Sequence, residues 1–422
     1  MSAPWFQRKL PPVAAPMDVA DLAYGLAGLW KGRAYRRQRV AEFKPYLGVD
    51  HVWGLSSGKA ALAVSLAALA GLSSRRRVII PAYSCFTVPA ALMRNTIELV
   101  VVDIDPETLD FDYAALEDAI DEHTLCVIPT HLFGLPADMD RVTALCRRWG
   151  AFVIEDAAQA MGGTYRGRRL GTLGDVGVFS FARGKHITCG SGGMMVTNSP
   201  EIARAIEAIY AGVEQGGLTA SLSNWLVVAT LFMFGGPRLY GVPASLPFLG
   251  LGETRFVSDF PIRRLDGMRA GLLWDWQARL EQGNLARIAS ATDLMARVSP
   301  ATVIQSRWAD PTVYLRLPLV LESPELKQEL CARADDLGLG ISPMYPSAIP
   351  AIPELRGRVG GADCPHAAWV ADRLVTLPVH PFVTERDRER LGRLVGDVVG
   401  DVVGGREAPM QDLMPLPDEV SV

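Results

Sequence analysis

Residues 179–193, FSFARGKHITCGSGG, place Lys185 between a short apolar segment and a glycine-rich turn. Lysine is scarce in this chain, with six lysines among its 42 lysine and arginine residues. Arginine keeps its proton in proteins, whereas a lysine can lose its proton and attack a carbonyl carbon. A loop lysine is most often a solvated surface residue. The residues around Lys185 must therefore decide between a surface position and a nucleophile.

Residues 56–62, SSGKAAL, combine a Ser-Ser-Gly turn with the first residues of an apolar helix. The first turn of a helix has free backbone N–H groups, which bind anions such as phosphate. The stretch is not a P-loop, because that motif needs glycine at the position of Trp53 and serine or threonine at that of Ala60. The turn is therefore either an anion site or a plain helix cap.

Residues 153–163, VIEDAAQAMGG, end an apolar strand with two carboxylates, Glu155 and Asp156. Neighbouring residues on a strand face opposite ways, so one of the two must point towards the core or a cleft. A buried carboxylate needs a cationic partner. That partner is either part of a structural ion pair or part of a ligand.

The three stretches together describe a site for pyridoxal phosphate. The aldehyde of this cofactor needs a lysine, its ring nitrogen needs an anion to stay protonated, and its phosphate needs N–H and hydroxyl donors. Lys185 would meet the first need and a buried aspartate the second. The turn at 56–59 would meet the third, together with Ser180, which ends a strand five residues before Lys185.

These side chains depend on an alternating pattern of short apolar strands and helices that begins near residue 50. We expect strands at 77–83, 97–105, 124–134, 151–157, 176–181 and 193–198, and helices at 58–72, 86–95, 112–121, 138–150 and 200–212. Such a pattern predicts a mainly parallel sheet with both faces covered. Ligands of these sheets bind at the carboxyl ends of the strands, which is where the three stretches lie.

The pattern divides the chain into four parts. Residues 1–49 are an N-terminal arm, and 50–258 form a large domain that ends in an apolar insertion at 213–258. Residues 259–404 hold a long linking helix at 263–298 and a small α+β domain. That domain has strands at 313–321 and 373–379 and helices at 323–338 and 384–399. Residues 405–422 are expected to be a disordered tail.

Composition excludes several classes of protein. The net charge is −4 and no long basic run occurs, so we expect no nucleic-acid partner. The six cysteines form no CxxC pair and no zinc spacing, which indicates a reduced cytoplasmic protein without a metal site. The most apolar run, residues 225–234, is too short to cross a bilayer, which needs about 20 residues.

The chain resembles the DegT/StrS-type sugar aminotransferases, which are pyridoxal phosphate enzymes of fold type I. The resemblance is carried by SSGKAAL, VIIPAYS, VVVDIDPETLDFD, PTHLFGLPADMD, VIEDAAQAMGGTYRGRRLGTLGDVGVFSF, KHITCGSGGMMVTN and CPHAAWVADRLVTLPVHP. It is close over about residues 50–212 and looser over about 260–400. It implies an α/β fold in which a large domain with a mainly parallel sheet precedes a smaller C-terminal α+β domain.

The resemblance also implies roles for individual residues. Lys185 would bind the cofactor covalently and act as the general base and acid, and Asp156 would pair with the ring nitrogen. Gln159 would lie against the phenolic oxygen of the ring. The residues around the phosphate would be Ser57, Gly58, Lys59 and Ser180.

The reaction implied is a ping-pong transamination, from an amino acid such as L-glutamate to a keto sugar, usually nucleotide-linked. Relatives that remove a hydroxyl group typically carry histidine in place of the lysine, and here Lys185 is present with His186 beside it. A non-sugar or lipid-linked carbonyl substrate is one alternative. A degenerate member that serves as a sensor or scaffold is another, and the intact Lys185, Asp156, Gln159 and Ser180 argue against it.

Several positions depart from the family pattern. Lys59 stands where threonine is usual, and Cys85 stands where an aromatic residue stacks on the cofactor, with Phe86 one place later. Which group stacks on the ring is therefore open. Tyr345 resembles a family position near the active site. His131 is either part of the pocket wall or a structural histidine with hydrogen bonds.

The apolar insertion needs a cover, because a free loop of this composition would expose a large apolar patch. Residues 225–256 carry one charged residue, Arg238, before Glu253. The segment could pack on its own domain, against a second subunit or against a membrane surface. In this family the following segment approaches the neighbouring subunit, so we expect the insertion to be mostly buried at or beside a homodimer interface.

Overall fold

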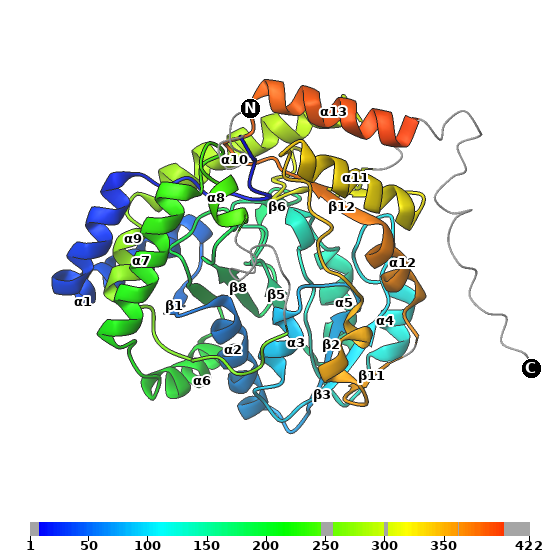
Figure 1. The fold of residues 1–422 in the computed structure, drawn as a ribbon. Helices are drawn as coiled ribbons and strands as arrows, with labels where there is room; N and C mark the ends of the chain where they lie inside the picture. Colours follow the sequence, from blue (N-terminus) through cyan, green and yellow to red (C-terminus); the bar gives the residue numbers. More distant parts are fainter. Residues whose placement is uncertain (1–7, 246–255, 299–302, 362, 401–422) are drawn as a thin grey trace, which may run out of the picture.

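The computed structural model describes residues 8–245, 256–298, 303–361 and 363–400 (Figure 1). The strands of the large sheet are β1 (His51–Leu55), β2 (Arg77–Pro81), β3 (Glu98–Val102), β4 (Thr124–Val127), β5 (Phe152–Asp156), β8 (Val176–Ser180), β9 (Gly193–Thr197) and β11 (Val359–Gly360). Their order is β1-β9-β8-β5-β4-β2-β3-β11. In this order, the six strands β8, β5, β4, β2, β3 and β11 are parallel to one another, whereas β9 pairs antiparallel with both β8 and β1. The predicted mainly parallel sheet is confirmed.

Helices cover both faces of this sheet (Figure 1). They are α2 (Gly58–Leu72), α3 (Thr87–Leu92), α4 (Tyr113–Ala119), α5 (Met139–Trp149) and α6 (Pro200–Ala211). Alternate residues of β2 belong to different cores: Ile80 packs in the cluster with α2, whereas Ile79 packs in the cluster with α4 and α5. This alternation is the period of two that a strand imposes. It explains why the strands are apolar on both faces.

Four of the five predicted helices of this domain begin at polar caps, and α3, which follows Phe86, does not. The side chains of Ser57, Asp112, Asp138 and Ser199 each accept a hydrogen bond from a first-turn N–H of α2, α4, α5 and α6. The shorter elements are the 3₁₀ turn η2 (Leu132–Gly134) and the strand pair β6 (Thr164–Tyr165) and β7 (Arg168–Arg169).

The small domain contains the antiparallel pair β10 (Leu317–Val320) and β12 (Leu374–Leu377). Its helices are α11 (Pro324–Asp336), α12 (Pro365–Arg373) and α13 (Glu385–Gly400), with 3₁₀ turns η5 (Ile349–Ala351) and η6 (Pro353–Leu355). Between these turns and α12, β11 joins the edge of the large sheet beside β3. This part of the chain therefore contributes to both domains. The predicted tail at 405–422 lies outside the described residues.

The single long helix expected at 263–298 is wrong. The structure has two helices there, α9 (Gly267–Leu272) and α10 (Trp276–Met295). Asp275, just before α10, has φ of 51°, which a continuous right-handed helix does not allow. The apolar periodicity continues on both sides of this break, which is why the sequence pattern did not reveal it.

The N-terminal part of the chain, expected to be an arm at residues 1–49, is largely helical. It contains α1 (Val19–Leu47), a helix of 29 residues that packs against α9. Glycines allow the close approach: a Cβ at Gly28 would lie 2.2 Å from Gly267 O. We had no prediction for α1 or for β1, which follows it and pairs with β9.

Residues 8–14, here called the N-terminal strap, lie along the small domain. Leu10 is fully buried, and its N–H donates to Gly338 O at 2.9 Å. His380 Nε2 donates to Pro11 O at 2.8 Å, so His380 is a structural histidine. Arg287, from α10, donates to Ala14 O at 2.7 Å. The strap therefore connects the small domain with α10 and α1.

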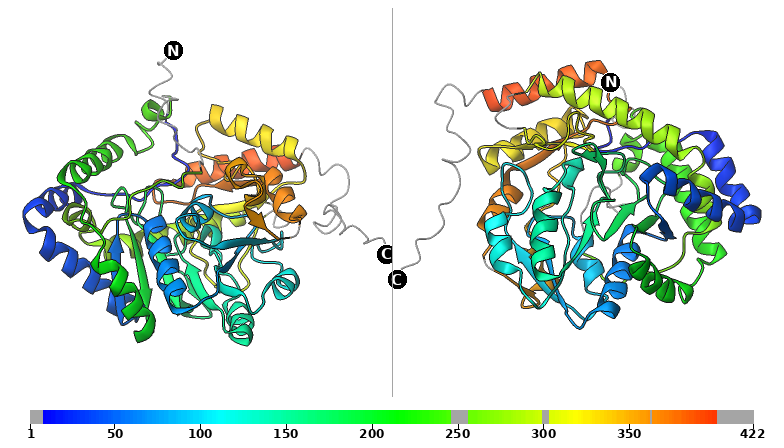
Figure 2. Two further views of the ribbon diagram at one scale, coloured as in Figure 1. Left: turned by 90° about the horizontal axis from the view of Figure 1, so that it is seen from below. Right: turned by 180° about the vertical axis from the view of Figure 1, so that it is seen from behind.

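The described part of the apolar insertion contains α7 (Leu218–Phe234), a helix of 17 residues, and the short α8 (Gly241–Ala244). α7 packs on α1 and α9, and all three helices lie at the end of the molecule away from α12 (Figure 2). Leu226 and Met233 on its outer side are 59% and 55% exposed. Their burial in a homodimer stays a prediction. Within the described ranges, no helix is long and apolar enough to span a membrane.

Gly177, in β8, allows a test of the close packing between this strand and Gly171. β8 runs parallel to β5, with Gly177 beside Glu155. A Cβ at Gly177 would lie 1.9 Å from Gly171 O. We predict that Gly177→Ala lowers the free energy of unfolding by about 1–3 kcal/mol, as overpacking does. Urea unfolding measures the change.

Gly396→Ala, in α13, is the matched control. Nothing lies within 4 Å of the added Cβ at Gly396. Alanine is a better helix former than glycine by about 1 kcal/mol, so this variant is expected to be as stable as the original protein or more stable. Equal losses in the two variants would show that the close contact at Gly177 is unimportant.

Candidate active site

Lys185 lies in the turn that follows β8, and its backbone N–H donates to Ala182 O at 3.3 Å. Burial lowers the pKa of its amine, an effect that Cys85 and Asp156 partly oppose and that the charge of Arg316 reinforces. A lowered pKa increases the fraction of amine without a proton, which is the form that attacks a carbonyl. By solvent-accessible area Lys185 is half-buried, not a fully solvated surface residue.

Asp156 is the last residue of β5 and is 6% exposed. Its Oδ1 accepts a hydrogen bond from the Ala158 N–H at 3.0 Å. Burial raises the pKa of its carboxyl, while the Ala158 amide and the charge of Lys185 lower it. Each of the two side chains thus acts on the other's charge, and the structure brings the predicted lysine and aspartate together.

Glu155 points the other way and has a structural role. Its carboxylate accepts hydrogen bonds from the N–H groups of Gly171, Leu173 and Gly174 at 2.5, 2.7 and 3.1 Å. His131 Nε2 lies 2.8 Å from Glu155 Oε1, while His131 Nδ1 accepts from the Ala137 N–H at 3.1 Å. That acceptor role leaves the ring proton on Nε2, where it is donated to Glu155. Of the two alternatives for His131, the structure therefore shows a buried histidine with both nitrogens hydrogen-bonded.

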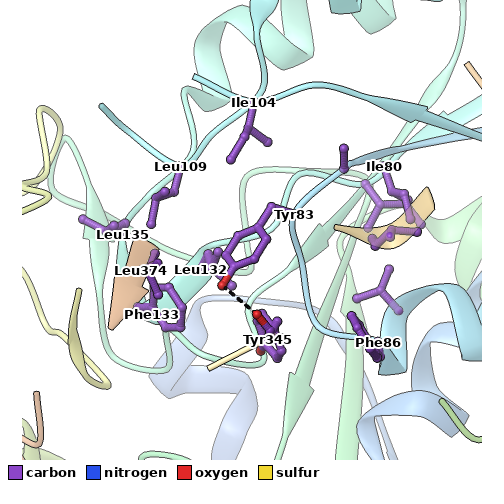
Figure 3. Close-up of a cluster of buried hydrophobic side chains, with 14 of the residues drawn as sticks. Ile80, Tyr83, Phe86, Ile104, Leu109, Leu132, Phe133, Leu135, Tyr345 and Leu374 are labelled. Atoms are coloured by element: carbon purple, nitrogen blue, oxygen red, sulfur yellow. Dashed lines mark hydrogen bonds between the residues drawn. The ribbon is translucent and has the colours of Figure 1, made fainter. Parts of the chain in front are cut away.

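Gln159 is hydrogen-bonded to an aromatic cluster, whose residues Phe86, Phe133 and Tyr345 are drawn in Figure 3. Its Nε2 donates to the Tyr345 hydroxyl at 3.0 Å, and its Oε1 accepts from the Phe133 N–H at 3.3 Å. The Tyr345 ring stacks with Phe86 and Phe133, with centroids 6.2 and 6.4 Å apart. The Tyr83 hydroxyl donates to Tyr345 O at 3.5 Å. Four segments distant in sequence therefore fix the orientation of one amide side chain.

Ser180 and the first turn of α2 lie against each other. A Cβ at Gly58 would lie 3.0 Å from Ser180 Cβ, and one at Gly193 would lie 2.4 Å from Gly58 N. Glycine at these positions lets β8, β9 and α2 meet without intervening side chains. Ser57 Oγ accepts from the Ala60 N–H at 3.1 Å, so Ser57 is also the helix cap. The turn at 56–59 is thus a cap placed beside the hydroxyl of Ser180.

Lys59 and Cys85 lie at the border of the same site. Lys59 Nζ is 3.4 Å from Val257 O and 4.8 Å from the centroid of the Phe260 ring. Burial lowers the pKa of Lys59, and Cys85 opposes that shift. Cys85 acts in the same way on Lys185. Phe86 packs on Tyr345. Of Cys85 and Phe86, it is therefore Cys85 that influences the amines of Lys59 and Lys185.

The helix of the insertion supports the turn after Lys185, which sequence reasoning missed. Asn224 Nδ2 donates to Cys189 O at 2.9 Å, and a Cβ at Gly190 would lie 2.4 Å from a methyl group of Val228. Both residues belong to the buried side of α7. Asn224, a polar residue directly before the apolar run 225–234, was the signal that could have indicated this contact.

Arg316 is a second residue that sequence reasoning missed. It directly precedes β10, and its guanidinium is near enough to Tyr345 and Cys85 to affect them electrostatically. Its Nη1 lies 2.8 Å from Met344 Sδ. A lone arginine in the apolar run VYLRLPLVL was the available signal.

The arrangement fits pyridoxal phosphate. Gly58 and Gly193 let the first turn of α2, with its free N–H groups, pack directly beside Ser180. Asp156 is a buried carboxylate that lacks an ion-pair partner within 4 Å among the described residues, as an acceptor for a ring N–H requires. Lys185 carries an amine whose pKa is lowered. Ser180, Asp156 and Lys185 would hold the phosphate, the ring nitrogen and the aldehyde respectively.

Comparison with known proteins agrees with this chemistry. Residues 30–220 match the DegT/DnrJ/EryC1/StrS aminotransferase family. L-glutamine:2-deoxy-scyllo-inosose aminotransferase of Streptomyces lividus is 36% identical over 333 residues, which are 72% of this chain and 78% of the relative. The chain belongs to the DegT/DnrJ/EryC1/StrS aminotransferase family.

Two further proteins extend the comparison. The dTDP-3-amino-3,4,6-trideoxy-alpha-D-glucose transaminase of Streptomyces venezuelae is 29% identical over 343 residues, 81% of each chain. The crystal structure of DesV from S. venezuelae superposes with a TM-score of 0.68 at 27% identity, covering 86% of this chain and 88% of DesV. The predicted fold, that of an aminotransferase of this family, is confirmed. In other alignments the chain spans only about half of the curated relative, 44% in two of them.

We predict that substitutions at the two adjacent carboxylates, Glu155 and Asp156, have different effects on the free energy of unfolding. We expect Glu155→Gln to lower the free energy of unfolding by about 2–4 kcal/mol. Its new NH₂ group would meet backbone N–H donors, and each buried donor left unsatisfied costs about 1–3 kcal/mol. Asp156→Asn is expected to unfold within about 1 kcal/mol of the original protein, because burial already disfavours the charge there. Urea unfolding of both variants, in protein stripped of bound small molecules, tests this. If Asp156→Asn lost more stability than Glu155→Gln, Asp156 would be the structural carboxylate and Glu155 the one available to a ligand.

Proposed function

We propose that the protein is a pyridoxal phosphate-dependent aminotransferase that moves an amino group from an amino acid to a keto sugar by a ping-pong mechanism. The observation that carries the proposal is that Lys185 and the buried Asp156 lie near enough to influence each other's charge, where β5 and β8 end at the carboxyl edge of the parallel strands. Family membership supports the same reaction. Cofactor-binding residues of the proposal are Ser57, Gly58, Lys59, Asp156, Gln159, Ser180 and Lys185.

Each residue of this chain has a definable task. When bound, pyridoxal phosphate supplies an aldehyde for the donor's amine and a ring that spreads negative charge. Lys185 Nζ would hold the aldehyde, and its free amine would take the proton from the donor's Cα. Asp156 would accept a hydrogen bond from the protonated ring nitrogen. Ser180 and the α2 turn would hold the phosphate, and Gln159 would lie against the ring with its fixed amide.

The substrates follow from the relatives as proposals. The names of the two curated relatives describe a keto cyclitol acceptor and a dTDP-linked sugar. We propose a nucleotide-linked keto sugar as the acceptor and L-glutamate as the donor. The S. lividus name includes L-glutamine as a donor, so a substrate screen should contain both amino acids. We place the reaction in the cytoplasm, where the free cysteines of the described residues would stay reduced.

We predict that Lys185→Ala abolishes transamination, by at least about four orders of magnitude, in a protein that still folds. Its methylene stem adds little packing, and alanine can neither bind an aldehyde nor move a proton. Turnover with the keto-sugar screen and the absorbance spectrum after addition of pyridoxal phosphate measure the effect. Lys31→Ala, at an exposed position of α1, is the control. Normal turnover by Lys185→Ala would refute the site.

We also propose that the protein is a homodimer and that the outer side of α7 lies in the interface. The support is the exposure of Leu226, Val227 and Met233 on one helix in a single chain. Exposed apolar groups of this size are normally covered by a partner. A membrane surface is less suited, since α7 carries no charged residue.

Paired substitutions Leu226→Asp and Met233→Asp should shift the protein from dimer to monomer in light scattering. Each buried charge is costly and would weaken the dimer by at least about tenfold. Leu285→Asp is the control, because this leucine is 68% exposed on α10. A doubly substituted protein that stays dimeric and fully active would exclude α7 from the interface, and binding of the original protein to liposomes would then be measured.

A further inference from the structure

The inner side of helix α1 is fixed to the rest of the molecule. A Cβ at Gly28 would lie 2.2 Å from Gly267 O, so α1 and α9 meet there without side chains between them. The carbonyl oxygen of Leu22 accepts a hydrogen bond from Trp225 Nε1 of α7 at 3.0 Å. These contacts set the rotation of α1 about its own axis. They therefore also determine which residues lie on its outer side.

The outer side of α1 carries an exposed tryptophan. Trp30 is 81% exposed, whereas tryptophan side chains in folded proteins are mostly buried. Positions on the same side of the helix follow from its period of 3.6 residues. Those positions are all exposed and hold mainly small or apolar residues, namely Val19, Ala23, Ala34, Arg37 and Ala41. The alanines on both sides of Trp30 are too short to cover its ring.

The same side of α1 is positively charged. Lys31, Arg33 and Arg37 are exposed, and within the described ranges none of them lies within 4 Å of a carboxylate. Arg39, on the inner side, is instead paired with Glu42 at 2.6 Å. Residues 22–41 hold five basic residues and no acidic one, whereas the whole chain has a net charge of −4, so the remainder carries −9. A local positive charge thus surrounds Trp30 in an otherwise acidic protein.

The outer side of α7 lies next to this face and differs from it in composition. α7 carries no charged residue, and its exposed Leu226 and Met233 suit contact with a second copy of the chain. In a twofold dimer the same patch of each copy meets, so two α1 faces would bring like charges together, which is unfavourable. α1 also forms the outer edge of the molecule (Figures 1 and 2). Its outer side is therefore suited to a partner of opposite charge.

We propose that the outer side of α1 docks on the surface of a bilayer that contains anionic phospholipids. Helices that lie in a bilayer interface combine tryptophan and other apolar side chains with lysine and arginine. Tryptophan is favoured at the level of the lipid headgroups, where its ring is shielded and its N–H can still be hydrogen-bonded. Lys31, Arg33 and Arg37 would contact lipid phosphates around Trp30.

The contact is peripheral, because within the described ranges no helix is long and apolar enough to span a membrane. The proposal does not depend on the proposed transamination, since it uses only the composition and exposure of α1. It goes beyond that function by giving the enzyme a place at a membrane surface. The homodimer proposed above would carry two α1 helices, which would strengthen docking if both faced one bilayer.

Co-sedimentation of the complete, cofactor-loaded protein with lipid vesicles measures the docking. One set of vesicles contains phosphatidylcholine alone, and a second set contains phosphatidylcholine with phosphatidylglycerol, each at low and at high salt. The variants are Trp30→Ala and the pair Arg33→Glu with Arg37→Glu. Duplex DNA serves as a second polyanion in a separate binding measurement.

Two control variants match these changes. The pair Arg386→Glu with Arg393→Glu introduces the same change of charge, because these two arginines are also exposed on a single helix, α13. Leu285→Ala is the control for Trp30→Ala, since this leucine is 68% exposed on α10. Light scattering and urea unfolding of every variant report the oligomeric state and the stability.

We expect the original protein to bind the vesicles with phosphatidylglycerol and to stay in solution with phosphatidylcholine alone. Each basic side chain near an anionic surface strengthens binding by about fivefold, so reversing Arg33 and Arg37 should weaken it by at least about 25-fold. Trp30→Ala should weaken it by at least about threefold, because less apolar area enters the interface. Both controls should stay within about twofold, and high salt should release the original protein by screening the charges.

Equal binding to the two kinds of vesicle, or an equal loss in the α13 pair, would overturn the proposal, because the charge of α1 would then be irrelevant. A change from dimer to monomer in the Arg33 and Arg37 variant would instead show that this face is an interface between copies. Binding to duplex DNA as tight as that to vesicles would make it a general polyanion site. A lower free energy of unfolding than that of the α13 pair would show a structural role for the two arginines and also overturn the assignment.

Discussion

The structure depends on how charge is accommodated at the carboxyl edge of a parallel sheet. Two successive carboxylates end β5, and the strand turns them to opposite sides. Glu155 receives three backbone N–H groups and the His131 ring, so its charge is satisfied by the protein alone. Asp156 receives one backbone N–H and the influence of Lys185. The unequal solvation of these two neighbours separates a structural group from one that can serve a ligand.

The same reasoning applies to the cations. Lys185 has a lowered pKa because burial removes water from its amine, and reactivity results from that loss. Arg316 keeps its proton under similar conditions, because its pKa falls only to about 10. The lysine and the arginine thus differ in how firmly each keeps its proton. One can become a nucleophile, while the other remains a fixed positive charge.

The sequence predicted the part of the fold that rests on local pattern. Helices with polar caps and strands with continuous apolar runs were found where expected, because capping and alternation are written within a few residues. The break at Asp275 was missed, since one residue with positive φ changes no apolar period. α1 was missed as well. Its contact with α9 depends on glycines facing glycines across more than 200 residues, as with Gly28 and Gly267.

Prediction of the site followed the same limits. Asp156 and Ser180 stand at the ends of β5 and β8, and Lys185 lies in the glycine-containing turn that follows β8, so sequence pattern alone could indicate their positions. The choice between Glu155 and Asp156, and between Cys85 and Phe86, required knowledge of which side each residue faces. Arg316 was not predicted, because its nearness to Tyr345 and Cys85 arises only in the folded chain.

The N-terminal strap has a consequence for biosynthesis. Its partners Gly338 and His380 are made more than 300 residues after Leu10 and Pro11. During translation the strap must wait without its contacts while the large sheet forms, and long loops of this kind close late. The small domain and the earliest segment of the chain therefore acquire their final form together.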